Sequence, residues 1–165
     1  MKPLLNYGPV ENKYVPEIVG WLNDPSVVKF SEQRFLKHTT ETQRDYMEQM
    51  LGHVYLGVFL DVAIIGTISA YIDRYNLVAN MGILIGDKAC WGKGYGFKAW
   101  SWLTQLLFAD SKLRKVEAGC MASNVGMMAI CQKAGMVEEG RQEGHFMCSK
   151  GVTDLVHWGK FNETI

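Results

Sequence analysis

The chain has 165 residues, and this length predicts a single domain spanning residues 1–165. Hydrophobic residues make up 48% and charged residues 21%, which excludes a disordered or collagen-like chain. Lys and Arg together number 17, as do Asp and Glu, so the net charge is zero. A protein whose main partner is nucleic acid usually has a basic excess, so we expect no nucleic-acid partner.

Cysteine spacing and hydropathy exclude two further classes. The cysteines Cys90, Cys120, Cys131 and Cys148 form no CxxC pair, and no Cys/His pair has the spacing of zinc ligands. We therefore expect reduced thiols in a cytoplasmic protein without a bound metal. The longest uncharged run, which ends at Gln132, is shorter than the roughly 20 apolar residues of a membrane span. We also expect no signal peptide and no membrane partner.

The first third of the chain predicts two helices. An apolar stripe predicts a helix over Pro16–Leu22, which Pro25 would end. A polar stretch follows over residues 31–38. Thr40 with Gln43 then fits a capping box that would begin a second helix.

From His53 onward the composition changes to β-branched and aromatic residues. Val54–Leu60 and Ile64–Ile72 predict two strands of a hairpin, because only a short link separates them. Leu77–Ile85 predicts a third strand, whose apolar run is typical of a central position in a sheet.

The remaining elements alternate between helix and strand. Asn124 is placed to cap one of these helices and Gly135 to end it. We expect helices over Phe97–Asp110 and Asn124–Ala134, a strand over Lys115–Cys120, and a closing hairpin over Gly140–Cys148 and Leu155–Phe161. This order predicts one sheet with helices on both faces.

A glycine-rich segment, Trp91–Gly96, stands between a predicted strand and a predicted helix. Its alternate glycines let the backbone curl closely, so that amide N–H groups and the helix N-terminus can hold a pyrophosphate. A tight turn without a ligand is the alternative interpretation. The spacing does not fit a P-loop, but Gly94-x-Gly96-x-x-Ala99 with Glu117 matches a dinucleotide fingerprint. Against that match, Asp87–Gly92 separates the glycines from the strand end. The supposed first strand is also the third or later strand of a short chain, which leaves too little sequence for a full dinucleotide fold.

The segment Gly82–Lys88 followed by Trp91–Gly96 resembles the acyl-CoA-binding motif of GNAT-superfamily N-acetyltransferases. That motif is Q/R-x-x-G-x-G/A, and Trp91 replaces its Gln or Arg. Asn124 with Lys133–Met136 resembles a second motif, found in the branch that includes the ribosomal-protein N-terminal acetyltransferases.

The resemblance extends into the closing segment, where Val137–Gly140 and Asp154 also fit the family, and it covers about residues 10–161. It implies an α+β domain with a mixed, mainly antiparallel sheet of about 6–7 strands and a splayed central strand pair. Trp21–Pro25 with Arg34–Phe35 and His38–Thr39 resembles acetyltransferases that act on amino sugars in bacterial surface-glycan pathways, although the same pattern occurs more widely in the branch.

The resemblance also implies which residues bind CoA. The pantetheine would lie in the gap beside the strand that ends near Gly86, where it would bond exposed backbone, and the pyrophosphate would lie on the loop amides. The residues concerned are Leu84, Ile85, Gly86, Trp91, Gly92, Lys93, Gly94, Tyr95, Gly96 and Asn124.

The chemistry of acetyl transfer needs a deprotonated amine and a stabilised thioester oxygen, and the leaving thiolate benefits from a proton. Where related proteins often have a Glu that holds a water as proton acceptor, this chain has Asn80, which can only orient. Where many have a Tyr general acid, it has Cys131, a weak donor. A small buried apolar residue is the alternative interpretation of Cys131. These two are the catalytic candidates.

Acceptor-binding candidates lie between the first two predicted helices, a region that covers the acceptor channel in the family. They are Glu32, Arg34 and His38, joined by Tyr71 at the end of a hairpin strand. A solvated loop is the alternative interpretation of this region.

The leading hypothesis is an enzyme that transfers an acetyl group from acetyl-CoA to a primary amine of a small molecule, such as an amino sugar. The alternatives are N-terminal acetylation of a protein, a non-catalytic acyl-CoA-binding module, and a nucleotide-binding oxidoreductase. The partners expected are acetyl-CoA, an amine acceptor and a second copy of the chain as a homodimer.

Overall fold

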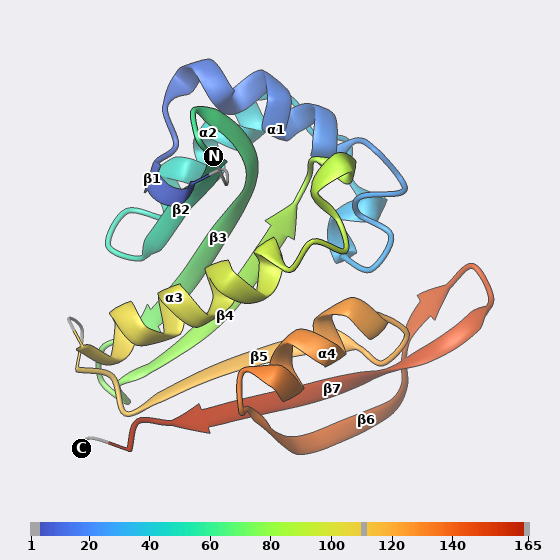
Figure 1. The fold of residues 1–165 in the computed structure, drawn as a ribbon. Helices are drawn as coiled ribbons and strands as arrows, with labels where there is room; N and C mark the ends of the chain where they lie inside the picture. Colours follow the sequence, from blue (N-terminus) through green and yellow to red (C-terminus); the bar gives the residue numbers. More distant parts are fainter. Residues whose placement is uncertain (1–3, 110–111, 164–165) are drawn as a thin grey trace. The chain divides into compact units, whose positions relative to one another are not determined.

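The computed structural model describes residues 4–109 and 112–163. The chain forms two compact units, one of Met1–Tyr71 with Gly82–Ala99 and the other of Ile72–Met81 with Trp100–Ile165. Seven strands follow the order β1-β2-β3-β4-β5-β7-β6 (Figure 1). β4 pairs with β5 in parallel, whereas the β1–β2, β2–β3, β5–β7 and β6–β7 pairs are antiparallel. The predicted mixed, mainly antiparallel sheet is thus confirmed.

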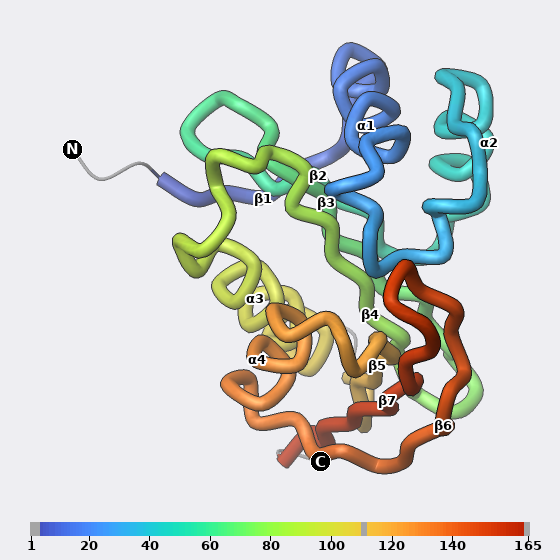
Figure 2. The backbone as a smooth tube through the Cα atoms, turned by 90° about the vertical axis from the view of Figure 1, so that its right-hand side faces the viewer, coloured from blue at the N-terminus to red at the C-terminus, as the bar shows by residue number. Residues whose placement is uncertain are grey.

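The first unit contains two helices and the hairpin that they cover (Figures 1 and 2). Its core joins Ile18 of the first helix to Phe59 and Ile64 of the hairpin strands, and the ring of Tyr14 meets Phe59 edge-on at 5.3 Å. Burial of these apolar side chains fixes the first helix against the hairpin. The elements are β1 Leu5–Pro9, η1 Asn12–Tyr14, α1 Val15–Leu22, η2 Glu32–Phe35, α2 Thr40–Gln49, β2 Val54–Leu60, β3 Ala63–Asp73 and η3 Lys88–Cys90.

The second unit is built on a long helix and a hairpin. Trp100, Leu103 and Leu107 lie fully buried on one stripe of that helix. The elements that lie wholly in this unit are β5 Lys115–Met121, α4 Val125–Lys133, β6 Val137–Cys148 and β7 Gly151–Phe161. The strands β3 and β4, Val78–Ile85, and the helix α3, Tyr95–Ala109, have residues in both units. Between β4 and β5, three residue pairs are in register, Val78–Asn80 with Lys115–Glu117.

The cap of α2 differs from the prediction by one residue. Thr39, and not Thr40, is the N-cap, because its hydroxyl accepts from the N–H of Thr42 at 3.2 Å. The hydroxyl of Thr42 accepts from the N–H of Thr39 at 3.0 Å and completes the capping box. Gln43, which the prediction placed in the box, is buried instead.

One strand and several boundaries were also missed, among them the start of β7 at Gly151, which the prediction placed at Leu155. β1 gives a weak pattern because it is short, and as an edge strand it tolerates Pro9 at its end. α3 begins at Tyr95, directly after the glycine-rich turn, and not at Phe97. β6 begins at Val137 because its register with β7 starts there and shifts near Gly140.

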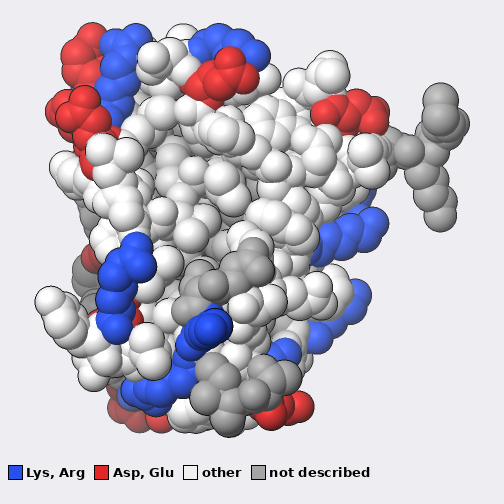
Figure 3. Space-filling view, turned by 90° about the vertical axis from the view of Figure 1, so that its left-hand side faces the viewer, with Lys and Arg blue, Asp and Glu red and all other residues white. Residues whose placement is uncertain are grey.

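The charged side chains of the described residues are distributed as expected for a chain with zero net charge. In the view of Figure 3, acidic and basic side chains lie in small groups of both signs separated by uncharged surface. Among the described residues, no helix is long and apolar enough to cross a membrane.

Candidate functional site

The glycine-rich segment forms a turn that only glycine adopts without strain. Gly92 and Gly94 have φ values of +71° and +79°, and a Cβ at either position would meet no atom within 4 Å. α3 begins at Tyr95, and the N–H of Lys98 donates to the carbonyl of Gly94 at 3.1 Å. The turn therefore presents open backbone directly before a 15-residue helix, whose N-terminus favours anions.

Trp91 ties this turn to the end of β4. Its indole Nε1 donates to the carbonyl of Ile85 at 2.7 Å, while 43% of the residue remains exposed. A Gln or Arg at this position could also donate, so the replacement by Trp keeps a donor and adds an apolar surface.

Gly86 is required by a close approach of the first helix. A Cβ there would overlap the ring of Trp21, so only glycine fits. The Gly86 N–H donates to the carbonyl of Ile65 at 2.9 Å, so this group is not open to pantetheine. The expected backbone contact at Gly86 is therefore limited to its carbonyl, and the pantetheine contacts of Leu84 and Gly86 stay predictions.

A pocket with a cavity volume of about 620 Å³ lies in the first unit. This volume is within the range of small-molecule sites. His38 and Tyr71 line it, as does Leu84 of β4. Glu32 and Arg34 are not among its lining residues. The guanidinium of Arg34 lies 4.2 Å from the centre of the Phe35 ring, and its Nη1 donates to the carbonyl of Ser31.

Most of the pocket's polar side chains were missed by the sequence analysis. Those on regular elements come from one face of α2, from β2 and from alternate positions of β3, which period-two and helical spacing could have grouped. Among the polar residues missed are Gln43, Tyr46, Tyr55, Thr67 and Ser69.

These side chains form a network of uncharged groups. Gln43 is 3% exposed, and its Nε2 donates to the Tyr55 hydroxyl at 2.9 Å. Tyr46 meets the Tyr55 ring edge-on at 5.2 Å and bonds the hydroxyls of Tyr71 and Ser69. Burial, as the largest cause, raises the pKa of both Tyr46 and Tyr55. Both phenols therefore stay protonated at neutral pH and serve as hydrogen-bonding groups.

The segment that carries His38 is held at two points. The Nδ2 of Asn23 donates to the His38 carbonyl and its Oδ1 accepts from the His38 N–H, both at 2.9 Å. The imidazole Nε2 lies 3.3 Å from the carbonyl of Gln33, which assigns a hydrogen to Nε2, since a carbonyl only accepts.

An ion pair lies next to Asn23 in the sequence. The ammonium of Lys88 bonds the carboxylate of Asp24 at 2.7 Å and lowers the pKa of that carboxyl.

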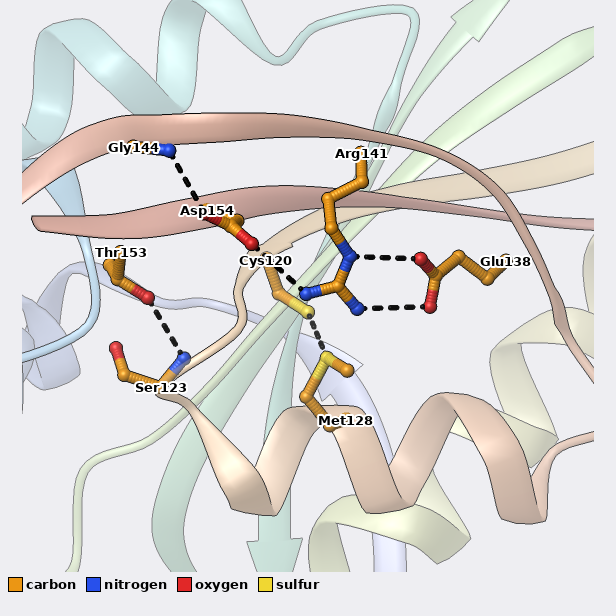
Figure 4. Close-up of polar contacts among 8 residues, drawn as sticks. All are labelled: Cys120, Ser123, Met128, Glu138, Arg141, Gly144, Thr153 and Asp154. Carbon is orange, nitrogen blue, oxygen red and sulfur yellow. Dashed lines mark hydrogen bonds and ion pairs between the residues drawn. The ribbon is translucent and has the colours of Figure 1, made fainter.

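The two catalytic candidates lie in the second unit. Asn80 is exposed on β4 and pairs with Glu117 of β5. Cys131 is fully buried in α4, and its hydrogen bond to Cys120, reinforced by burial, raises the pKa of the thiol. A raised pKa makes Cys131 a poorer proton donor, which supports the interpretation as a small core residue. Cys120 also lies 3.6 Å from the Met128 sulfur (Figure 4).

The closing hairpin is joined by an arginine fork (Figure 4). Arg141 bonds both carboxylate oxygens of Glu138, at 3.1 and 3.2 Å, and reaches Asp154 at 3.2 Å. Asp154 also accepts from the Gly144 N–H at 2.9 Å. Glu138 and Asp154, which resembled the family's closing segment, thus hold the two strands across the register shifts of β6.

Asn124 caps α4 as predicted, because its Oδ1 accepts from the Met127 N–H at 3.1 Å. Gly135, with φ +73°, follows the end of the helix. The role of Asn124 toward pantetheine stays a prediction. Among the described residues, no group of three or more His, Cys, Asp and Glu is arranged to hold a metal ion.

Known acetyltransferases are similar to this chain. The protein named "Probable N-acetyltransferase YjcK" from Bacillus subtilis (strain 168) is 35% identical over 113 residues, which cover 62% of this chain and 62% of that protein. The match thus spans less than two thirds of the curated relative.

Solved structures extend the likeness in fold. The spermidine N-acetyltransferase of Vibrio cholerae, in complex with CoA and spermine, has a TM-score of 0.85 at 16% identity over 96% of this chain and 95% of that chain. The ribosomal-protein-S5-alanine acetyltransferase of Vibrio fischeri has a TM-score of 0.82 at 19% identity over 96% and 93%. At such identities the likeness shows the fold alone.

The family follows from the sequence match. The model of the acetyltransferase (GNAT) domain matches residues 5–137, which include the glycine-rich turn and the pocket-lining elements. The chain belongs to the GNAT acetyltransferase family.

Proposed function

We propose that this protein transfers the acetyl group of acetyl-CoA to a primary amine of a small molecule. One observation carries the proposal: β4 lines the pocket through Gly82–Leu84 and then continues to the turn at Trp91–Gly96. A CoA whose pyrophosphate lies on that turn and whose pantetheine follows Leu84 would bring its thioester toward the pocket. Both features lie in the first unit.

The turn fits a pyrophosphate for two physical reasons. The open left-handed glycines let phosphate oxygens approach the amides of Gly92–Gly96, and the first turn of α3 adds N–H groups without intrahelical partners. Lys93 supplies a positive charge beside them. Trp91 holds the turn to β4 through Ile85.

The reaction is a direct attack in a ternary complex. The amine nitrogen bonds the acetyl carbonyl carbon, the C–S bond breaks, and the CoA thiolate leaves and takes up a proton. The amine must lose one proton before it attacks and another afterwards, and alignment of the two substrates supplies much of the rate. His38 and Tyr71 are proposed to position the acceptor, since both line the pocket. Asn80 belongs to the second unit and does not line the pocket, so its part in orienting a water or the acceptor rests on the resemblance alone.

A protein N-terminus is the second candidate acceptor, favoured by the ribosomal-protein acetyltransferase among the similar structures. An acyl-CoA-binding module without turnover is the third candidate, because Asn80 and the buried Cys131 are poor proton-transfer groups. The family membership leaves the dinucleotide interpretation of Gly94-x-Gly96-x-x-Ala99 without support. A cytoplasmic location and a homodimer remain part of the proposal.

Two measurements test the proposed function. Calorimetry should show that acetyl-CoA binds, with NADH as the control dinucleotide. Thiol release from acetyl-CoA in the presence of a panel of primary amines should then show turnover. Binding of NADH but not of acetyl-CoA would contradict the proposal, and binding without turnover on any amine or peptide would favour the non-catalytic module.

A further inference from the structure

The charge of the pocket limits the kind of acceptor, if the proposed function holds. Among its described lining residues there is no Asp or Glu, and the lining side chains that can carry a charge at neutral pH are Lys37 and His38. A polyamine brings several ammonium groups, each of which loses water on entering and needs a carboxylate as partner. This pocket supplies none and adds a cation of its own, so it disfavours polyamines.

The inner wall of the pocket offers paired uncharged groups instead. Gln43 is nearly fully buried, and its Nε2 donates a hydrogen bond to the Tyr55 hydroxyl at 2.9 Å. Gln43 lines the pocket, and its Oε1 is a hydrogen-bond acceptor. Because the Tyr55 oxygen accepts from Gln43, the Tyr55 hydroxyl keeps its hydrogen as a donor. Thr67 belongs to the same network and also lines the pocket.

A second phenol is arranged in the same way. The Tyr46 hydroxyl is hydrogen-bonded to both Ser69 and Tyr71. All three residues line the pocket, and each of their hydroxyls can both donate and accept. The pocket combines a buried acceptor with phenolic donors, and a ligand hydroxyl, which both donates and accepts, satisfies this set.

We propose that the acceptor is a hydroxylated monoamine, and that Gln43 and Tyr55 select it by hydrogen-bonding its hydroxyl groups while the absence of carboxylates in the lining rejects polyamines. An amino sugar has this chemistry, with one amine and several neutral hydroxyls on a ring. The aromatic faces of Tyr46 and Tyr55 suit the apolar side of such a ring.

The test compares three amines at saturating acetyl-CoA: glucosamine, cyclohexylamine as a ring of the same size without hydroxyls, and spermidine. The expected kcat/KM is highest for glucosamine and at least about tenfold lower for each of the others, the loss that one unmade hydrogen bond or more would cause. Equal or better use of spermidine would overturn the inference. It would leave the proposed acetyl transfer intact, which only a failure to bind acetyl-CoA would remove.

Variants assign the selection to the two residues. Gln43→Leu and Tyr55→Phe should each lower the ratio of glucosamine to cyclohexylamine activity by about tenfold. Gln43→Glu adds a carboxylate and should raise the relative use of spermidine. Gln105→Leu changes an exposed glutamine of α3 outside the pocket and should leave all three rates unchanged. An unchanged ratio in both pocket variants would refute the assignment.

A binding experiment tests the inference if acetyl-CoA binds but no amine is turned over. Calorimetry of glucosamine and spermidine against the protein–CoA complex then replaces the rates. Binding of glucosamine that weakens in Gln43→Leu supports the inference, provided that circular dichroism shows the variant folded. Absence of glucosamine binding, or tighter binding of spermidine, overturns it.

Discussion

At Gly94, the backbone conformation requires glycine, and the proposed pyrophosphate site requires open space beside the same residue. Its φ of +79° is a region that β-branched residues rarely adopt, and the space around its Cβ position is open. We therefore expect Gly94→Val to weaken acetyl-CoA binding by at least about tenfold while the protein stays folded, because a branched Cβ blocks the phosphate approach and strains the turn. Isothermal titration calorimetry with acetyl-CoA measures the loss.

Gly52 provides the matched control for that variant. It has a φ of +86° and equally open space, but it lies in the turn between α2 and β2. Gly52→Val should lower the melting temperature about as much as Gly94→Val and leave acetyl-CoA affinity unchanged. Unchanged affinity in Gly94→Val would contradict the pyrophosphate assignment.

Cys131 tests whether a thiol serves as general acid. The residue is fully buried and its pKa is raised, so we expect Cys131→Ala to retain most of the activity, with the leaving thiolate protonated by water. Stopped-flow or steady-state kcat is the measurement, with the melting temperature as a check on the small cavity created. A fall in kcat of about a hundredfold or more, typical of lost general-acid catalysis, would reverse the interpretation.

At the scale of elements, the N-cap of α2 can be tested by mutation. The sequence analysis placed the cap at Thr40, whereas the backbone conformation places it at Thr39, which carries the same hydroxyl. Thr39→Ala should destabilise the protein by about 1 kcal/mol because it removes the acceptor for the Thr42 N–H. The melting temperature should fall by about 2–4 °C.

Thr40→Ala is the comparison, because its hydroxyl bonds only the exposed Glu41 carboxylate among the described contacts. That variant should change the melting temperature by less than half as much. A larger effect of Thr40→Ala than of Thr39→Ala would place the cap where the sequence pattern first put it.

Strands and helices with a clear period were predictable, and those without one were not. The hairpin of β2 and β3 was predicted because β-branched residues fill both strands. β1 escaped prediction because five residues with Gly and Pro carry little pattern, and it exists through pairing with β2. Its hydrogen bonds are non-local, so no local signal could reveal them.

At the scale of the whole molecule, the turn was predictable and the pocket was not. Gly92 and Gly94 were recognisable from the sequence, since the left-handed backbone needs glycine and only one residue separates them. Gln43 and Tyr55 gain their meaning only when α2 is placed against β2, 12 residues apart in sequence. The sequence analysis instead selected charged residues of the loop, of which Glu32 and Arg34 do not line the pocket.

The lack of Asp and Glu among the described lining residues of the pocket also bears on how the amine loses its proton. Free primary amines are mostly protonated at neutral pH, and no carboxylate is found among the described lining residues. We therefore expect kcat/KM to climb with pH toward the pKa of the acceptor itself, because the enzyme binds the neutral amine instead of deprotonating it with a dedicated base. Initial rates between pH 5 and about 10 give the profile.

His38 and Glu32 are the candidates for a general base that would remove the proton from the amine. The imidazole Nε2 faces the Gln33 carbonyl, which leaves Nδ1 as the nitrogen that could accept a proton. If these residues only position the acceptor, His38→Gln and Glu32→Gln should raise KM more than they lower kcat. Glu32→Gln should have the smaller effect, because Glu32 is outside the pocket lining. An inflection near pH 6–7, the ordinary range of a histidine, that disappears in His38→Gln would instead assign proton removal to that imidazole.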